Sequence, residues 1–256
     1  MCPQPEVAIE FADASYRLDS RDLLSNLNLS ITRGEIFMLL GRSGSGKTTS
    51  LKLINRLLVP TAGEVRVSGR ATTEWDPIRL RRGIGYAIQE VGLFPHYTVE
   101  KNVGLVPRLE DWPRGKTEQR VREVLELVGL APADFLGRYP HQLSGGQRQR
   151  VGLARALAAN PPMLLMDEPF GALDPLTRVQ LQQEFRELQR RLGKTIVFVT
   201  HDVSEALLLG DRIALLENGR LLHVYTRDEF LSSEDPATQA YLAAFRSSQR
   251  LWEERK

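Results

Sequence analysis

The sequence predicts an α/β protein built around a mixed, mostly parallel wound sheet. Three apolar runs have the length and continuity of buried strands, namely IFMLLG, MLLMD and TIVFVT. Amphipathic stretches of helical period lie between such runs, for example LTRVQLQQEFRELQRRLG. Strands that alternate with helices are typical of sheets whose parallel strands are joined by crossover connections.

Composition narrows the class of protein. With 256 residues and 42% hydrophobic side chains, the chain can bury a sizeable core. A net charge of +2, from 34 basic and 32 acidic residues, gives no overall attraction to nucleic acid, so we predict no nucleic-acid partner. The single cysteine, Cys2, excludes an internal disulfide and fits a reducing compartment. The apolar runs are shorter than the ~20 residues of a membrane span, and no secretory signal is seen, so we expect a cytoplasmic protein.

The order of elements predicts a single domain over residues 1–256. Residues 6–31 alternate between apolar and polar in short bursts, which predicts an antiparallel β subdomain at the N-terminus. Residues 93–159 carry helical periodicity and predict an inserted α-helical subdomain. We expect a core at approximately 6–92 and 160–235, a hairpin with an Asn-Gly turn at ENGRLLHVY, and a helical tail over 236–256.

The stretch GRSGSGKT, Gly41–Thr48, predicts a nucleoside triphosphate site. It follows a strand and precedes a helix, which is the context that distinguishes a phosphate-binding loop from an ordinary glycine-rich turn. Backbone N–H groups would close around phosphate oxygens, Lys47 would supply a positive charge, and the Thr48 hydroxyl would bind Mg²⁺. The nucleotide-binding residues predicted here are Gly41, Ser43, Gly44, Gly46, Lys47, Thr48 and Thr49.

Two adjacent carboxylates end the apolar run MLLMDEP. Asp167 and Glu168 follow a buried strand, at the edge where ligands of open α/β sheets bind. We predict that Asp167 holds Mg²⁺ through water and that Glu168 polarises the attacking water. A solvated strand end is the alternative when such a pair stands alone, but the phosphate-binding loop in the same chain favours the catalytic interpretation.

The string LSGGQRQRVGLARAL resembles the signature motif of ABC-type ATPase domains. Its serine and glycines stand where a helix begins, and a simple N-cap is the alternative interpretation. The resemblance implies a head-to-tail pair of subunits in which each signature helix completes the partner's nucleotide site. Ser144, Gly145 and Gly146 would face that γ-phosphate, and Gln147 is predicted as a further nucleotide-binding residue.

Other positions match the same family in chain order. Tyr16 resembles the aromatic residue that stacks on adenine, and Gln89 resembles the glutamine that reaches Mg²⁺ and communicates with the membrane partner. Asp174, in GALD, resembles part of the loop by which the two subunits sense one another, and His201 resembles the switch histidine at the γ-phosphate. A core or surface tyrosine, a solvated strand end, a helix cap and a structural histidine are the respective alternatives. The family implies ATP and Mg²⁺ as cofactors.

A finer resemblance concerns the transported solute. Asn55, Arg56 and the segment VGLFPHYTVEKN are similar to ATPase subunits of osmoprotectant and quaternary-amine importers, of the glycine betaine, carnitine and choline class. An importer for polar amino acids and a non-transport ABC ATPase are the alternatives. Members of this subgroup often carry regulatory CBS domains after the ATPase core, and this chain stops at Lys256.

The resemblance also implies the partners and the location. We expect a homodimer on ATP binding, because both half-sites are intact in this sequence. A polytopic membrane permease would supply the pore, and an extracytoplasmic substrate-binding protein would act indirectly. The protein is therefore expected at the cytoplasmic face of the membrane, peripherally bound.

Overall fold

A computed structural model describes residues 6–89, 91–171 and 173–253, with side chains described as far as Ser247. The chain forms two compact units, Met1–Ala71 with Val197–Lys256, and Thr72–Ile196. The chain enters the second unit at Thr72 and returns to the first unit at Val197, in the middle of a strand. Among the described residues, no helix combines the length and the apolar character needed to cross a bilayer.

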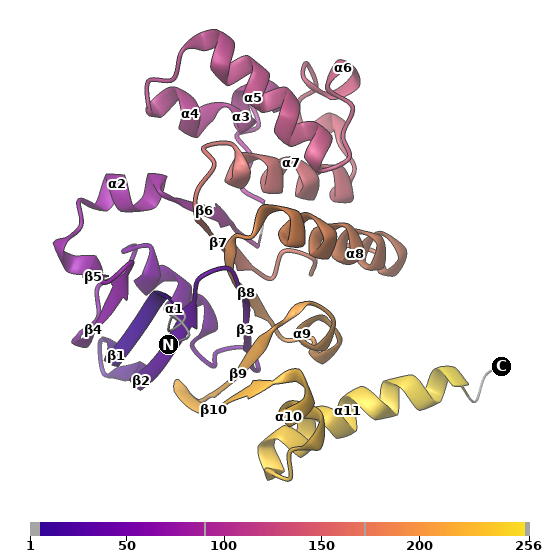
Figure 1. The fold of residues 1–256 in the computed structure, drawn as a ribbon. Helices are drawn as coiled ribbons and strands as arrows, with labels where there is room; N and C mark the ends of the chain where they lie inside the picture. Colours follow the sequence, from indigo (N-terminus) through magenta and orange to yellow (C-terminus); the bar gives the residue numbers. More distant parts are fainter. Residues whose placement is uncertain (1–5, 90, 172, 254–256) are drawn as a thin grey trace, which may run out of the picture. The chain divides into compact units, whose positions relative to one another are not determined.

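The first unit contains two groups of strands with helices beside them (Figure 1). Its elements are β1 (Val7–Leu18), β2 (Arg21–Thr32), β3 (Ile36–Leu40), α1 (Lys47–Ile54), β4 (Ala62–Val67), β5 (Arg70–Ala71), the greater part of β8 (Thr195–Thr200), α9 (Val203–Leu209), β9 (Arg212–Glu217), β10 (Arg220–Thr226), α10 (Arg227–Ser232) and α11 (Pro236–Glu253). Helix α11 lies in the segment 236–256, for which the sequence predicts a helical tail.

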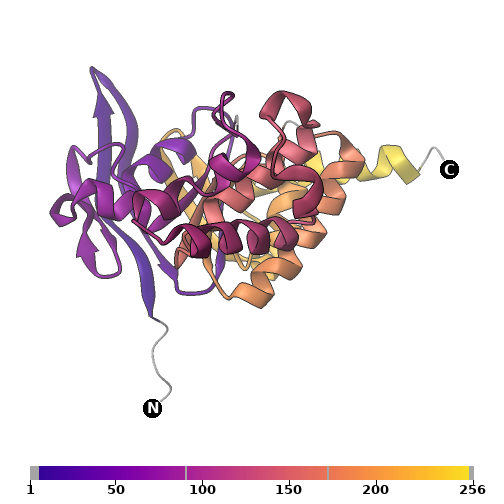
Figure 2. The same cartoon turned by 90° about the horizontal axis from the view of Figure 1, so that it is seen from above.

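The N-terminal antiparallel sheet predicted from the sequence is present, in the order β2-β1-β4-β5. Figure 2 shows β1 and β2 as long paired strands. Phe11 is paired with Leu29 on one side and with Val65 on the other, and all three side chains are buried. Alternation of buried and exposed side chains keeps one face of the sheet on the core.

Strand β3 is buried along its whole length and leads directly into the glycine-rich loop. It pairs in parallel with β9, Leu40 opposite Leu215, and the order within this unit is β10-β9-β3-β8. The predicted hairpin joins β9 to β10. Asn218 and Gly219, at φ 50° and 76°, form its turn, which is the conformation that an Asn-Gly pair favours.

The second unit is mostly helical and contains two parallel strands. Its elements are η1 (Thr72–Glu74), α2 (Pro77–Arg82), β6 (Ile84–Ala87), α3 (Val99–Val103), α4 (Leu105–Leu109), α5 (Arg114–Leu127), α6 (Pro132–Phe135), η2 (Pro140–Gln142), α7 (Gly145–Leu157), β7 (Met163–Asp167) and α8 (Pro175–Leu192). Helix α7 lies against α3, α5 and β6 (Figure 1). A Cβ on Gly85 would lie 2.4 Å from the Ala156 carbonyl oxygen, so only glycine allows α7 to approach β6 this closely.

Helix α8 has start and stop signals at both ends. Asp174 caps its N-terminus, Pro175 occupies the first turn, and Gly193 ends it at φ 58°. Leu181, Phe185 and Leu188 are buried at helical spacing, and burying each side chain contributes about 2 kcal/mol. This stripe fixes which face of α8 is turned inward.

Candidate functional site

The loop between β3 and α1 has the backbone of a phosphate cradle. Gly44 and Gly46 have φ 79° and 100°, in the left-handed region that favours glycine. A Cβ on Gly46 would lie 2.6 Å from Leu24 Cδ2, and one on Gly41 would lie 2.4 Å from the Leu216 carbonyl oxygen. Helix α1 begins at Lys47, so its N-terminal N–H groups and the positive end of its dipole face the loop.

Lys47 is held over this loop although it is almost completely buried. Its Nζ donates to the carbonyl oxygens of Gly41 at 2.7 Å and of Arg42 at 2.9 Å. Ser45 is also buried, and its hydroxyl has no hydrogen-bond partner among the described residues. The sequence pattern does not single out Ser45, because it occupies a variable position of the motif.

Tyr16 belongs to the strand pair that borders the loop. It is half-buried and opposite Leu24, and register shifts interrupt β1 on both sides of it. Leu24 is the fully buried side chain that lies next to Gly46. Sequence reasoning missed Leu24, because its contact with the loop is tertiary. Stacking of Tyr16 on adenine stays a prediction.

His201 lies just after β8, in a turn fixed by hydrogen bonds. The Thr200 hydroxyl donates to the Glu205 carboxylate and accepts from the Asp202 N–H at 2.9 Å. These bonds leave the His201 side chain exposed at the end of a buried strand. His201, Arg42 of the loop and Tyr241 of α11 line one groove of about 370 Å³.

In the second unit, the two adjacent carboxylates differ in surroundings. Asp167 ends β7 and is 5% exposed, whereas Glu168 is half-buried with φ 45°. That left-handed conformation costs a non-glycine residue about 1 kcal/mol or more, and it interrupts the alternation of side chains along the strand. Burial and the Asp167 charge together raise the pKa of the neighbouring Tyr86 to about 12.

Gln89 lies near the same sheet edge as Asp167. Strands β6 and β7 are parallel, with Ala87 opposite Met166. Asp167 is the last residue of β7, and Gln89 lies just past the end of β6. Gln89 is exposed in the turn after β6. Amide and carboxylate oxygens are the ligand types that Mg²⁺ prefers. Among the described residues, no group of three or more His, Cys, Asp and Glu side chains forms a candidate metal cluster by itself.

The signature stretch forms the first turn of α7. Ser144 accepts from the Gln147 N–H at 3.2 Å, and the Gln147 side chain accepts from the Ser144 N–H at 3.0 Å, which completes a capping box. Gly145 borders open space, whereas a Cβ on Gly146 would lie 2.7 Å from Thr177 Cγ2. The N-termini of α7 and α8 therefore lie against one another.

Asp174 caps α8 at this same place. Its side chain accepts from the Thr177 N–H at 3.1 Å, and hydrogen bonding to Thr177 holds the pKa of Asp174 below its usual value. Of the predicted GALD loop, Ala172 lies outside the described residues. Each unit thus gathers a separate group of predicted residues: Tyr16, the loop and His201 in the first, and Gln89, the carboxylates, the signature turn and Asp174 in the second.

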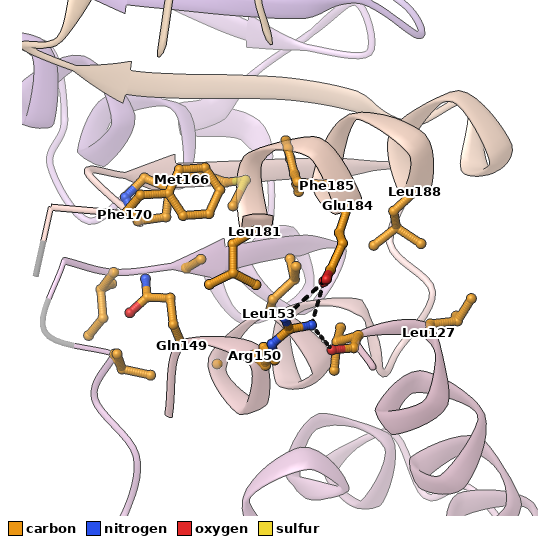
Figure 3. A pocket seen from close by; sticks show the side chains of 16 residues that line it. Leu127, Gln149, Arg150, Leu153, Met166, Phe170, Leu181, Glu184, Phe185 and Leu188 are labelled. Atoms are coloured by element: carbon orange, nitrogen blue, oxygen red, sulfur yellow. Dashed lines mark hydrogen bonds and ion pairs between the residues drawn. The ribbon is translucent and has the colours of Figure 1, made fainter. Parts of the chain in front are cut away.

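A small cavity of about 30 Å³ is lined by side chains of α7, α8 and the neighbouring strands β6 and β7 (Figure 3). Arg150 of α7 borders it, pairs with Glu184 of α8 and donates to the Val128 carbonyl oxygen at 2.7 Å. Apart from this pair and Gln149, the side chains around the cavity are mainly apolar, including Leu153, Met166, Phe170, Leu181, Phe185 and Leu188. Such a lining suits packing and small apolar groups rather than phosphate.

A family model described as ABC transporter matches residues 24–171, more than half of the chain. The chain belongs to the ABC transporter family. This ABC-family chain is 52% identical over 232 residues to the glycine betaine/carnitine/choline transport ATP-binding protein OpuCA of Bacillus subtilis, over 91% of this chain and 60% of the relative. It is 50% identical over 209 residues to the osmoprotectant import ATP-binding protein OsmV of Salmonella typhimurium, over 82% and 55%.

A third relative of the ABC-family chain is the glycine betaine uptake system ATP-binding protein YehX of Escherichia coli, 50% identical over 84% of this chain and 69% of the relative. The chain spans between 55% and 69% of the length of these three relatives.

The dimeric ATP-binding cassette MJ0796, in a post-hydrolysis state with ADP and Pi, matches at a TM-score of 0.77 and 36% identity, over 86% of this chain and 98% of that one. The predicted fold class, an α/β ABC ATPase, is confirmed.

Proposed function

We propose that this chain is the ATP-hydrolysing subunit of an importer for osmoprotectants such as glycine betaine, carnitine or choline. The observation that carries the proposal is the glycine-dependent loop Gly41–Thr48 ahead of α1, with Lys47 buried over it. The solute class is inferred from relatives that are about 50% identical to this chain and whose names specify glycine betaine, carnitine and choline in one case, glycine betaine in another and osmoprotectants in the third.

In this proposal, the first unit supplies most of the contacts to ATP. The loop glycines with Ser43, Thr48 and Thr49 bind phosphate through the backbone and hydroxyl groups, and Tyr16 stacks on adenine. Lys47 exchanges its bonds with loop carbonyls for bonds with phosphate oxygens, because a phosphate is the more strongly charged acceptor. Bound Mg²⁺ would neutralise phosphate charge, and its protein ligands would be the hard oxygens of Thr48, Gln89 and Asp167.

Hydrolysis requires a group that orients water. Glu168 accepts a proton from the attacking water, and the left-handed backbone at this residue directs its side chain away from the register of β7. His201 and Lys47 stabilise the charge that develops on the transferred phosphoryl group. Glu168 thus acts as a general base, whereas His201 and Lys47 act by position and charge.

We further propose that two copies close on ATP. Ser144, Gly145, Gly146 and Gln147 of one copy face the phosphates of the other, and Asp174 beside them reports closure to the partner. The first turn of α7 is suited to an anion because its residues are small or uncharged and its dipole is positive at this end.

The membrane partner would contact the segment that follows Gln89. Phe94 is 41% exposed there, and its ring lies 5.4 Å from the Tyr97 ring. Exposed aromatic side chains on a fixed backbone are typical of interface anchors. A permease and an extracytoplasmic substrate-binding protein complete the importer, which locates this chain at the cytoplasmic face of the membrane.

The proposal is tested first by light scattering of Glu168→Gln on gel filtration, with and without Mg-ATP. This change preserves ATP binding and slows hydrolysis, so a dimer should accumulate with ATP only. Ser144→Arg in the same background should abolish that dimer by blocking the signature turn. The shared-site proposal would be contradicted if Glu168→Gln bound ATP but stayed monomeric, and if it also failed to pair with ATP after reconstitution with the permease.

The solute is tested in proteoliposomes that contain the permease and its binding protein. Glycine betaine, carnitine or choline should stimulate ATP turnover, whereas a polar amino acid should leave it at the unstimulated rate. Stimulation by the amino acid alone would reassign the importer. An absence of any membrane association would favour a non-transport ATPase.

A further inference from the structure

The chain makes a strained bend immediately after the turn that carries Gln89. Val91 and Gly92 have φ 53° and 55°, and the left-handed region is rarely adopted by a β-branched residue such as valine. A Cβ on Gly92 would lie 2.5 Å from Ile88 Cδ1, so the bend is also tight on its inner side. Contacts from outside the segment must therefore hold it in place.

Arg155 of helix α7 makes those contacts. Its Nη2 donates to the Val91 carbonyl oxygen and its Nη1 to the Gly92 carbonyl oxygen, both at 2.6 Å. Burial lowers the pKa of Arg155, which marks a guanidinium withdrawn from water to make these bonds. Gly152, one turn earlier, leaves space for the Val91 side chain, since a Cβ there would lie 2.6 Å from Val91 Cγ1.

The exposed rings beyond the bend are fixed by a second buried group. Asn102 is fully buried, accepts from the Phe94 N–H at 2.8 Å and donates to the carbonyl oxygens of Phe94, Tyr97 and Thr98 at 3.0–3.1 Å. We call Phe94, His96 and Tyr97 the aromatic cluster, because their ring centroids lie 4.5–6.0 Å apart. These bonds fix the cluster on helix α3, and because Phe94 stands directly after the bend and Leu93, they also keep the start of the cluster close to the bend.

We propose that Arg155 is a positioning residue that fixes the aromatic cluster to helix α7, so that the cluster moves together with the signature turn. Arg155 follows Ser144 by three helical turns, about 16 Å along one rigid helix. Force applied at the signature turn therefore reaches the bend without an intervening loop. The role of the cluster as the permease contact rests on the proposed function, whereas the mechanical link does not.

The link is tested by spin-label mobility in the isolated protein. Cys2→Ser with His96→Cys gives one exposed label on the cluster. Arg155→Ala should increase the mobility of that label. Arg120→Ala is the matched control, because Arg120 also donates to two consecutive carbonyls of the same helix region, Leu157 and Ala158, both at 3.1 Å.

Both variants should melt at similar temperatures, but only Arg155→Ala should change the label spectrum, and Arg155→Lys should restore part of it. If Arg155→Ala fails to fold, Gly152→Ala displaces Val91 while keeping the arginine and should mobilise the label as well. An unchanged spectrum in the folded Arg155→Ala or Gly152→Ala protein would overturn the proposal.

The consequence for coupling is measured in proteoliposomes with the permease. Arg155→Ala removes both charge-assisted hydrogen bonds to the bend and should lower permease-stimulated ATP turnover about tenfold or more, the factor that corresponds to losing even one such bond, with an unchanged KM for ATP. A mobilised label with full stimulation would overturn the coupling role. If the unaltered protein shows no stimulation, the proposed function fails, and the label measurement still decides whether the link exists.

Discussion

Adding one methyl group to either glycine of the signature turn should separate folding stability from subunit closure. In Gly145→Ala the new Cβ meets nothing within 4 Å, whereas in Gly146→Ala it lies 2.7 Å from Thr177 Cγ2. Alanine is favoured over glycine in a helix by about 0.5–1 kcal/mol, so Gly145→Ala should raise the free energy of unfolding by up to this amount. The same gain at Gly146 is opposed by overpacking of about 1–3 kcal/mol, which leaves a net loss of roughly 1 kcal/mol.

Thermal unfolding of the two variants should therefore differ in sign, by about 2–4 °C for each kcal/mol in a chain of this size. Both variants, placed in the Glu168→Gln background, should lose the ATP-dependent dimer, because a methyl group at either position occupies the approach of phosphate to the backbone. A Gly145→Ala protein that dimerises with ATP like its parent would refute the phosphate-binding role of this turn. A Gly146→Ala protein that melts above Gly145→Ala would refute the importance of the Thr177 contact.

Three further predictions follow from single contacts. Asn102→Ala leaves the Phe94 N–H and the Tyr97 carbonyl oxygen without their side-chain partner, whereas the Phe94 and Thr98 carbonyls keep the N–H groups of Tyr97 and Asn102. Urea unfolding should therefore show a loss of about 2 kcal/mol or more in the free energy of unfolding, and a loss below about 1 kcal/mol would contradict the role assigned to this buried amide. Gly46→Ala should abolish binding of a fluorescent ATP analogue, and adding Leu24→Ala should not restore it, because the new Cβ would still lie 2.9 Å from the Leu23 carbonyl oxygen and the φ of 100° remains unfavourable. Hydrogen bonding to Thr177 lowers the pKa of Asp174, so the stability that the Asp174 carboxylate contributes is present at neutral pH and is lost as the pH falls through that lowered pKa. Asp174→Asn should therefore flatten the acid limb of a plot of unfolding free energy against pH. An unchanged acid limb would contradict this.

Features that depend on neighbouring residues were predictable from the sequence. The glycine-rich loop, the caps at Ser144 and Asp174 and the Asn-Gly hairpin each rest on a few consecutive residues whose backbone preferences agree with the fold. The buried strands were recognised for the same reason, since a short apolar run bounded by turn residues has few alternatives.

Features that depend on distant contacts were not predictable. Arg155 and the bend it holds are more than 60 residues apart, so the sequence contains no local sign of their pairing. The left-handed conformation of Glu168 also escaped prediction, because nothing in the residue type favours it and the surrounding packing has to enforce it. The sequence predicts only that both carboxylates follow a buried strand at the ligand-binding edge of the sheet.

The insertion of the second unit has a consequence for the order in which the protein is made. The Ile36 N–H, where β3 begins, is hydrogen-bonded to Asp211, which lies 175 positions later, and both neighbours of β3 in its sheet come from beyond Lys194. The ribosome therefore releases the whole of Thr72–Ile196 before the strand that supports the glycine-rich loop has anything to pair with. During synthesis this strand is an unprotected edge, which exposes nascent chains to aggregation. We expect the loop to acquire its binding shape only when translation is nearly finished, so cellular ATP can stabilise the finished chain but not its precursors.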